Sequence, residues 1–417
     1  MKEQILHRIV DFFLRSPDFN GILLTHLRGE MELAWADLQT IIADLMKGEE
    51  VTLAFESHSG DPHIKRLPDL PLDEQLKRLK SDDPSTTCAY PSSRVISASS
   101  DHSLYEGLPF TRRIALAEAQ LTPVFFRLDV LDRYYRDPRY HFTFYDFGGS
   151  ITIKSEHYAS QDTDERDKVL LQTFGIGYDS KRNRVVIVYL RYLADLSPEH
   201  QQNWSGYVVT DNCSMNIDYA RATINGDRPI YHSAYQALLA EQAEINKLSK
   251  LIGKPNLFRK TFDENRPEGF HPMLRPTLKN FDEFVHLLDK LLSENINRAF
   301  FEGDIPLDHE VQRKDGRIQI DRPGTIRLLE EWLSSTYRTA NGEDISEDIS
   351  KEVISPLKEI RDLHQRPAHG MTGNSYSPAY AKQQDDLVGN VVRALTKLRL
   401  IFHRILRLAI GTTHPTG

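Results

Sequence analysis

Apolar residues at the start of the chain recur at the spacing of amphipathic helices. A first apolar stripe comprises Ile5, Ile9, Phe12 and Phe13. The break from Ser16 to Gly21 is suited to capping a second helix. A third apolar face comprises Leu33, Leu38, Ile41, Ile42 and Leu45. Val51–Phe55 then has the composition of a strand. Residues 1–58 are therefore expected to form a module of three short helices followed by a strand.

Residues 59–120 show no comparable periodicity. Six prolines interrupt this range, and the segment from Ser92 to Ser103 is rich in serine. One short helix is expected around Asp73 to Leu79. The remainder is predicted to be a loop-rich connector.

Residues 121–235 carry the strand signals. Tyr140–Phe147 is followed by a Gly-Gly turn and Ser150–Ile153, which predicts a hairpin. Val169–Tyr178 and Arg184–Leu190 predict a second hairpin because both are rich in β-branched and aromatic residues. The glycines within Val169–Tyr178 lack the spacing of a phosphate-binding loop and are expected to bend the strand. We therefore expect an α+β middle domain.

The short segment before the first hairpin interleaves arginine with tyrosine. Arg133, Arg136 and Arg139 alternate with aromatic rings that suit stacking on bases. Asp132 and Asp137 lie among them and offer ion-pair partners. Surface ion pairs and a nucleic-acid contact therefore remain alternative interpretations.

From about residue 236 the spacing of apolar residues is helical to the end. Helices are predicted at Ala237–Leu251, after Asn280 and Thr325 as capping residues, at Ile354–Leu363 and at Tyr380–Leu408. The last of these has a basic outer face with Arg393, Lys397, Arg404 and Arg407. That face either is simply solvated or contributes to an RNA groove. Residues 236–417 are expected to form an all-helical domain.

The composition limits the classes of protein to which this chain can belong. The 417 residues carry a formal net charge of −8, so any nucleic-acid site must be a local basic patch. The two cysteines, Cys88 and Cys213, have no metal-type spacing, and no disulfide framework is expected. The chain has neither a signal-peptide pattern nor the roughly 18 apolar residues that a membrane span needs. We expect an α+β protein of the cytoplasm that makes no membrane contact.

The candidate chemistry is concentrated between Arg361 and Gly370. Arg361, His364, Arg366 and His369 lie within nine residues, and the two histidines are five positions apart. Imidazole transfers protons near neutral pH, and guanidinium binds phosphate oxygens without losing its charge. The alternative is an ordinary helix C-terminus, where basic residues complement the dipole and Gly370 is the cap.

The run His364-Gln365-Arg366-Pro367-Ala368-His369-Gly370 resembles the motif of the HEPN superfamily, whose small helical domains occur in many prokaryotic ribonuclease toxins and antiviral effectors. It fits the motif's spacing, its polar second position and its Ala-His-Gly ending. It departs at the first position, where His364 stands in place of the usual arginine. Arg361 and Arg366 flank that position. The resemblance covers about residues 280–410.

The resemblance implies a metal-independent endoribonuclease that acts as an antiphage defence effector or toxin. It implies catalytic roles for His369, His364, Arg361 and Arg366, with no metal and no cofactor. Gln365, Arg393 and Lys397 are expected to contact RNA. It also implies a homodimer through the C-terminal helical domain, with the apolar stripes of the last helices as its interface.

The N-terminal module resembles winged helix-turn-helix domains in its element order. Its predicted recognition segment, Leu33–Met46, is acidic because Glu32, Asp37 and Asp44 lie in or beside it and arginine is lacking. A DNA-reading helix needs cations and amides. Either a protein partner or DNA is expected at this module.

Two other functions remain open for the whole chain. It could be a non-enzymatic DNA-binding regulator or a catalytically inactive HEPN scaffold in a defence complex.

Overall fold

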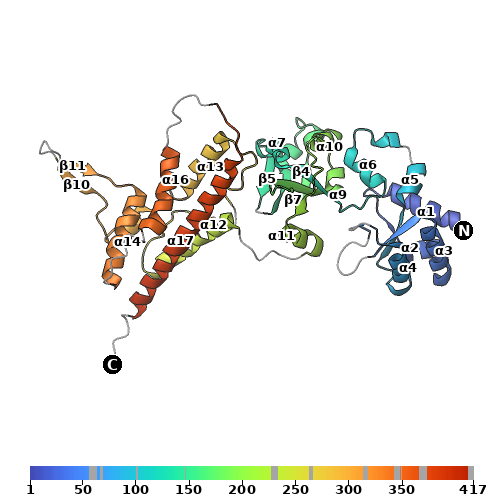
Figure 1. The fold of residues 1–417 in the computed structure, drawn as a ribbon, viewed down its shortest axis with the longest axis horizontal. Helices are drawn as coiled ribbons and strands as arrows, with labels where there is room; N and C mark the ends of the chain where they lie inside the picture. Colours follow the sequence, from blue (N-terminus) through green and yellow to red (C-terminus); the bar gives the residue numbers. More distant parts are fainter. Residues whose placement is uncertain are drawn as a thin grey trace. The chain divides into compact units, whose positions relative to one another are not determined.

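The computed structural model describes residues 1–55, 63–65, 69–99, 102–145, 147–226, 233–262, 266–312, 318–341, 348, 350–365 and 373–411. The chain combines α-helices with antiparallel sheets, which confirms the α+β class (Figure 1). It divides into two compact units, Met1–Pro229 and Ile230–Gly417.

The first unit begins with helices around a small sheet. The elements are α1 (Lys2–Arg15), β1 (Ile22–Leu23), α2 (Leu24–Glu30), α3 (Trp35–Lys47) and β2 (Val51–Phe55). The predicted three helices and strand are thus present, and β1 is an addition. The sheet order is β1-β3-β2, with both outer strands antiparallel to β3 (Thr87–Pro91). Ile5, Ile9, Leu38 and Ile42 are buried in the core between helices and sheet.

The range 59–120, expected to be loop-rich, contributes several regular elements. The elements are α4 (Leu72–Ser81), β3, α5 (Ser93–Ser99), the 3₁₀ turn η1 (His102–Tyr105) and α6 (Pro109–Ala115). The short helix expected at Asp73–Leu79 corresponds to α4. Gln75 fixes α4 to the sheet, because its buried side chain accepts a hydrogen bond from the Leu53 amide at 2.8 Å. This segment therefore completes the N-terminal sheet.

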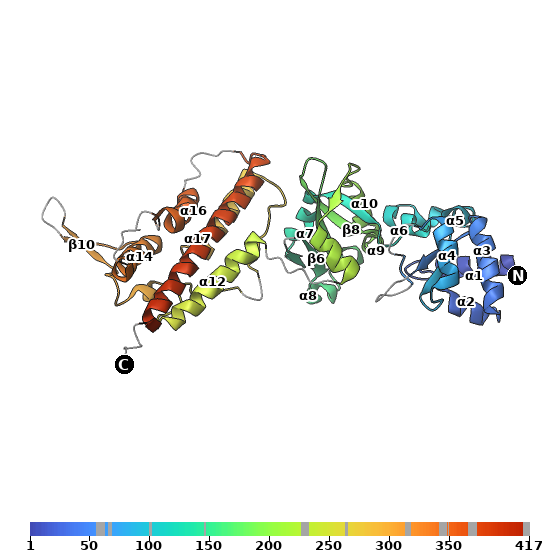
Figure 2. The same cartoon turned by 60° about the horizontal axis from the view of Figure 1, so that its bottom comes forward.

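A larger antiparallel sheet follows in the same unit, and its strands β6 and β8 are labelled in Figure 2. The strand order is β4-β8-β7-β6-β5, and β9 pairs with β7. Its strands are β4 (Pro123–Arg127), β5 (Tyr140–Phe144), β6 (Gly148–Ile153), β7 (Leu170–Tyr178), β8 (Arg184–Tyr189) and β9 (Ser214–Met215). The pairs β5–β6 and β7–β8 are the two predicted hairpins. Short helical elements connect or follow these strands, namely η2 (Leu128–Leu131), α7 (Asp132–Tyr135), α8 (Ser155–Tyr158), η3 (Glu165–Asp167), α9 (Leu190–Ala194), α10 (Pro198–Ser205), α11 (Ile217–Ala220) and η4 (Arg221–Asn225).

The expected role of the β7 glycines is strand bending, and the structure shows a further role at Gly175. A Cβ atom added at Gly175 would lie 2.2 Å from Cδ1 of Tyr219. Tyr219 is buried and stacks on Tyr189, with ring centroids 5.8 Å apart. Gly175 is thus required because an aromatic ring lies directly against the strand.

The second unit is mainly helical. Its elements are α12 (Ala234–Leu251), α13 (Leu278–Leu291), η5 (Arg298–Phe301), the hairpin β10 (His309–Gln312) and β11 (Ile318–Asp321), α14 (Thr325–Asn341), the π-helical turn η6 (Ser350–Ile354), α16 (Ser355–Gln365) and α17 (Ala379–Gly411). Asn280, expected as a cap, lies inside α13, and Thr277 caps the helix by accepting from the Asn280 amide. Among the residues that the structure describes, no helix combines the length and the apolar character that a membrane crossing requires.

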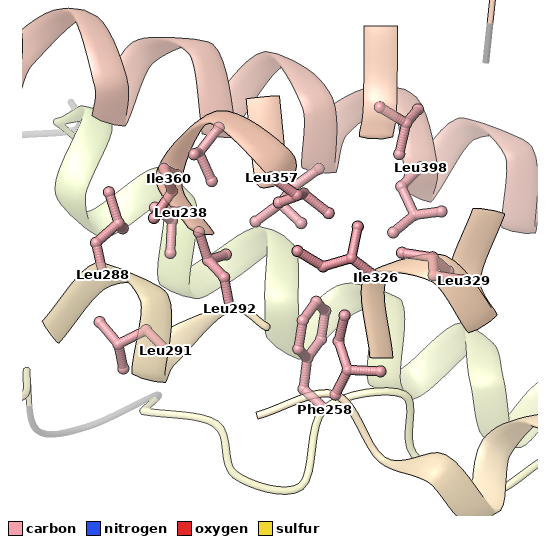
Figure 3. Packing of buried hydrophobic residues seen from close by; sticks show 14 of the residues in the cluster. Leu238, Phe258, Leu288, Leu291, Leu292, Ile326, Leu329, Leu357, Ile360 and Leu398 are labelled. Atoms are coloured by element: carbon pink, nitrogen blue, oxygen red, sulfur yellow. The ribbon is translucent and has the colours of Figure 1, made fainter. Parts of the chain in front are cut away.

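One hydrophobic core joins these helices (Figure 3). Leu238 comes from α12, Leu288 from α13, Leu329 from α14, Leu357 and Ile360 from α16 and Leu398 from α17. Helix α12 lies along α17, and their contact includes an ion pair of 2.7 Å between Glu241 and Arg399. Most of the apolar stripe of α17, expected as a dimer interface, is buried inside this core, whereas Leu408 is 41% exposed. The buried residues are used for folding and are not available for that role.

Candidate functional site

Helix α16 brings two of the predicted catalytic residues to the surface of the second unit. Leu357 and Ile360 on this helix are buried in the core. Arg361 and His364 are three residues apart, so they lie on neighbouring positions of one helix face. That face is next to α13, where the side chains of Asp289 and His286 meet them.

Asp289 is the centre of the cluster. Its side chain is only 1% exposed, and its Oδ2 atom accepts from Arg361 Nη1 at 2.6 Å and from His364 Nδ1 at 2.7 Å. Oδ1 accepts from the Ser293 hydroxyl. A buried carboxylate is costly unless its oxygens are paired. Asp289 therefore fixes the positions of Arg361 and His364 relative to each other.

His286 extends the cluster to the solvent. Its Nδ1 atom lies 2.6 Å from Nε2 of His364, and the ring centroids are 4.5 Å apart. His286 is exposed, whereas His364 is partly buried. Both ring nitrogens of His364 are consequently engaged, one by Asp289 and one by His286.

With His364 neutral, the hydrogen bonds fix which ring nitrogens carry protons. A carboxylate only accepts, so His364 Nδ1 must carry a proton where it meets Asp289. A neutral His364 then accepts at Nε2, which requires His286 to donate from Nδ1. Under this assignment the remaining nitrogen of His286, Nε2, has a free lone pair.

The same cluster offers oxygen and nitrogen atoms to a cation. Asp289, Glu294 and His364 each have a ligand atom within 4.8 Å of the others. Arg361 Nη1 already lies 2.6 Å from Asp289 and 3.8 Å from Glu294. A metal ion would have to displace this guanidinium and the Nδ1 proton of His364. The donor set therefore fits a guanidinium better than a metal ion.

The other predicted site residues lie elsewhere or outside the described residues. Gln365 is exposed at the end of α16. Arg366 and His369 fall outside the residues that the structure describes. Arg393 and Lys397 on α17 line a groove of about 580 Å³.

This groove, called the α17 groove below, is also lined by Lys351, Glu352, Pro356, Asn390, Val392, Thr396 and Leu400. Lys397 forms an ion pair with Glu352 at 2.7 Å, while Arg393 donates to Asn390. Pro356 precedes His364 by eight residues of helix, which corresponds to about 12 Å. The α17 groove is thus at the opposite end of α16 from the Asp289 cluster.

Sequence reasoning missed His286, Asp289, Ser293 and Glu294. Asp289 had a detectable signal, because it follows Leu288 on the apolar side of α13, where a carboxylate needs a partner. His286 had no such signal. Its exposed position on the helix is normal for a histidine, and only the approach of α16 brings it to His364.

The arginine-rich segment of the first unit forms ion pairs. Arg136 pairs with Asp132 at 2.9 Å, and Arg139 pairs with Asp137 at 2.7 Å and with Asp167 at 3.0 Å. Two interpretations were left open for this segment, surface ion pairs and a nucleic-acid contact. The ion pairs are present in the structure.

A buried network lies beside that segment. The Tyr134 hydroxyl lies 2.5 Å from His200 Nδ1 and accepts from Trp204 Nε1 at 2.8 Å. Burial, and then the positive charge of Arg133, lower the pKa of His200 to about 4. His200 is completely buried and therefore packs as a neutral core residue.

Comparison with known proteins gave no relative. A scan against protein-family models, a search of curated proteins and a search of solved structures each found no match.

Proposed function

We propose that this protein is a metal-independent endoribonuclease of the HEPN type that acts as an antiphage defence effector or toxin. The observation that carries the proposal is the cluster in which Arg361 and His364 are joined through buried Asp289 and extended to solvent by His286. It has a guanidinium and imidazoles at one surface, and His364 is the first residue of the run that resembles the HEPN motif. Such a set suits phosphodiester cleavage.

The proposed reaction uses the ribose 2′-hydroxyl as the nucleophile. The 2′ oxygen forms a bond to phosphorus while the bond from phosphorus to the 5′ oxygen breaks. A base takes the 2′ proton, and an acid returns a proton to the 5′ oxygen. The products are a 2′,3′-cyclic phosphate and a 5′-hydroxyl. DNA lacks the 2′-hydroxyl and is not cut.

The residues divide between these tasks. His369 is assigned as the acid on the basis of the motif, and Arg361 and Arg366 supply positive charge for the phosphate. His364 has both ring nitrogens engaged within the protein, so it is a positioning residue in this proposal.

The α17 groove is the proposed path of the RNA backbone. Arg393, Lys397 and Lys351 line it together with the single acidic residue Glu352, which leaves a local excess of positive charge on a chain with a net charge of −8. Exposed cations of this kind neutralise phosphates without reading sequence. Gln365 is the corresponding polar contact at the other end of α16.

The proposed assembly is a homodimer through the second unit that brings two copies of the motif together. We place the protein in the cytoplasm.

The N-terminal module is assigned to sensing or regulation. Its three helices and its sheet order β1-β3-β2 support the likeness to a winged helix. The acidic residues Asp37 and Asp44 on α3 favour a protein partner over DNA.

One observation favours an inactive scaffold as the second candidate. His364 replaces the usual arginine of the motif, and its nitrogens are taken up by Asp289 and His286. A scaffold would bind RNA and leave it intact.

Product analysis separates the two candidates. Purified protein is incubated in EDTA with an RNA oligonucleotide and with its 2′-O-methyl counterpart. We expect cyclic-phosphate products from the RNA alone. Binding without cleavage of either oligonucleotide would support the scaffold, and cleavage of the 2′-O-methyl strand would refute the mechanism.

A further inference from the structure

His286 is the histidine of the cluster that the solvent reaches. It is exposed on α13, and its Nδ1 atom is hydrogen-bonded to His364. Among the residues that the structure describes, none forms a hydrogen bond with its Nε2 atom. Nothing in the HEPN-like motif assigns this residue, since it lies 78 positions before His364.

We propose that His286 is the general base of the reaction and that it acts through His364 and Asp289. This inference rests on the proposed ribonuclease function and adds a base that the motif does not contain. The three side chains form a continuous line of hydrogen bonds, 2.6 Å between the two rings and 2.7 Å between His364 and Asp289.

The line transfers charge away from the surface. His286 Nε2 takes the proton of the 2′-hydroxyl, and the proton on His286 Nδ1 moves to His364 Nε2. His286 is then neutral again, with its proton on Nε2. His364 becomes an imidazolium that faces the Asp289 carboxylate. One proton enters the cluster, so its net charge rises by one, and the new positive charge on His364 faces the Asp289 carboxylate.

The surroundings of Asp289 explain why this direction is favoured. The carboxylate is 1% exposed, and it already accepts from Arg361 and Ser293 as well as from His364. A cation that forms on His364 is held close to this buried carboxylate, where the attraction is stronger than in water. Asp289 is therefore a positioning residue, and His286 is the group that contacts the substrate.

The test compares His286→Ala with His403→Ala in the 417-residue protein. His403 lies on α17 of the same unit and takes no part in the cluster. RNA cleavage is measured in EDTA, with and without added imidazole, and thermal melting verifies folding. We expect His286→Ala to lose about a hundred- to ten-thousandfold in rate, and added imidazole to restore part of it. His403→Ala should cut like the wild type.

Several results would overturn the inference. If the wild type cuts RNA and His286→Ala cuts equally well, His286 is not the base and the ribonuclease proposal still stands. Loss of activity that imidazole does not restore gives His286 a purely structural role. If the wild type cuts no RNA, the proposed function itself fails, together with this inference.

A second measurement tests the proton arrangement without any substrate. Nitrogen-15 NMR of the histidine rings reports which nitrogen carries the proton. We expect His364 and His286 both to be protonated on Nδ1, and Asp289→Asn to shift the population on His364. A His364 ring protonated on Nε2 alone would overturn the relay.

Discussion

Asp289 is the single residue on which the geometry of the C-terminal cluster depends. It is a carboxylate at the edge of a hydrophobic core, and each of its contacts offsets part of the cost of removing it from water. The three partners come from helix α16, which carries Arg361 and His364, and from the turn after α13, which carries Ser293. Removing any of them leaves the carboxylate less well paired.

Arg361→Ala should therefore destabilise the protein. Loss of a partner from a fully buried ion pair costs about 3–5 kcal/mol, and Arg361 is partly exposed, so we expect about 1–3 kcal/mol in the free energy of unfolding. Arg327→Ala is the matched control, because that arginine also pairs with two carboxylates but at the surface. Its expected cost is below about 1 kcal/mol. Urea denaturation measures both, and equal costs would contradict the role of Asp289.

His200 gives the first unit a predicted dependence on pH. Its pKa is lowered to about 4 in the folded protein because of burial, compared with about 6.5 in the unfolded chain. The unfolded state therefore binds the proton more readily. The free energy of unfolding should be highest above pH 6.5 and should fall as the pH drops towards 4, by about 2 kcal/mol at pH 5.

The variant His200→Gln removes this titration. It is expected to be less stable than the wild type at pH 7.5, and the difference should shrink at pH 5. Denaturation at the two pH values, followed by tryptophan fluorescence, measures the effect. An unchanged difference would show that His200 does not titrate as its burial predicts.

Among the elements, those with long periodic patterns were predicted and those formed by tertiary contacts were not. The two hairpins and helix α17 agree with the sequence to within a few residues. Strand β3 was missed because all five of its residues are buried, so no alternation of apolar and polar residues marks it.

The residues of the candidate site likewise divide into those that a local pattern predicts and those that only tertiary contacts bring together. Arg361 and His364 follow from a local motif, whereas Asp289 and His286 belong to the site only because α13 lies beside α16.

The packing of α11 on β7 can be tested through Gly175. A Cβ atom there would overlap the ring of Tyr219, so Gly175→Ala should cost about 1–3 kcal/mol in the free energy of unfolding. Gly29→Ala in α2 is the control, because nothing lies within 4 Å of its added Cβ atom and alanine favours the helix. Thermal melting of both variants measures the two changes in stability. A Gly175→Ala variant as stable as the wild type would contradict the close approach of Tyr219.

For the whole molecule, we expect a homodimer through the second unit. Most apolar residues of α17 that were expected to form the interface are buried in the unit's own core, so the dimer must use other surface. Leu400, which is 53% exposed beside Lys397, is one apolar residue that remains available. Light scattering at micromolar concentration should report the molar mass of a dimer. A monomer at every concentration would exclude a composite cleft.

Cleavage of RNA in EDTA by the wild type, by His369→Ala and by His403→Ala decides whether this chain is a metal-independent ribonuclease. His369 belongs to the motif, and His403 is an unrelated histidine of α17. We predict cutting by the wild type and by His403→Ala, and a fall of about a hundred- to ten-thousandfold for His369→Ala with folding intact. Equal cutting by wild type and His369→Ala, or cutting that appears only when Mg²⁺ is added, would contradict the HEPN-type mechanism.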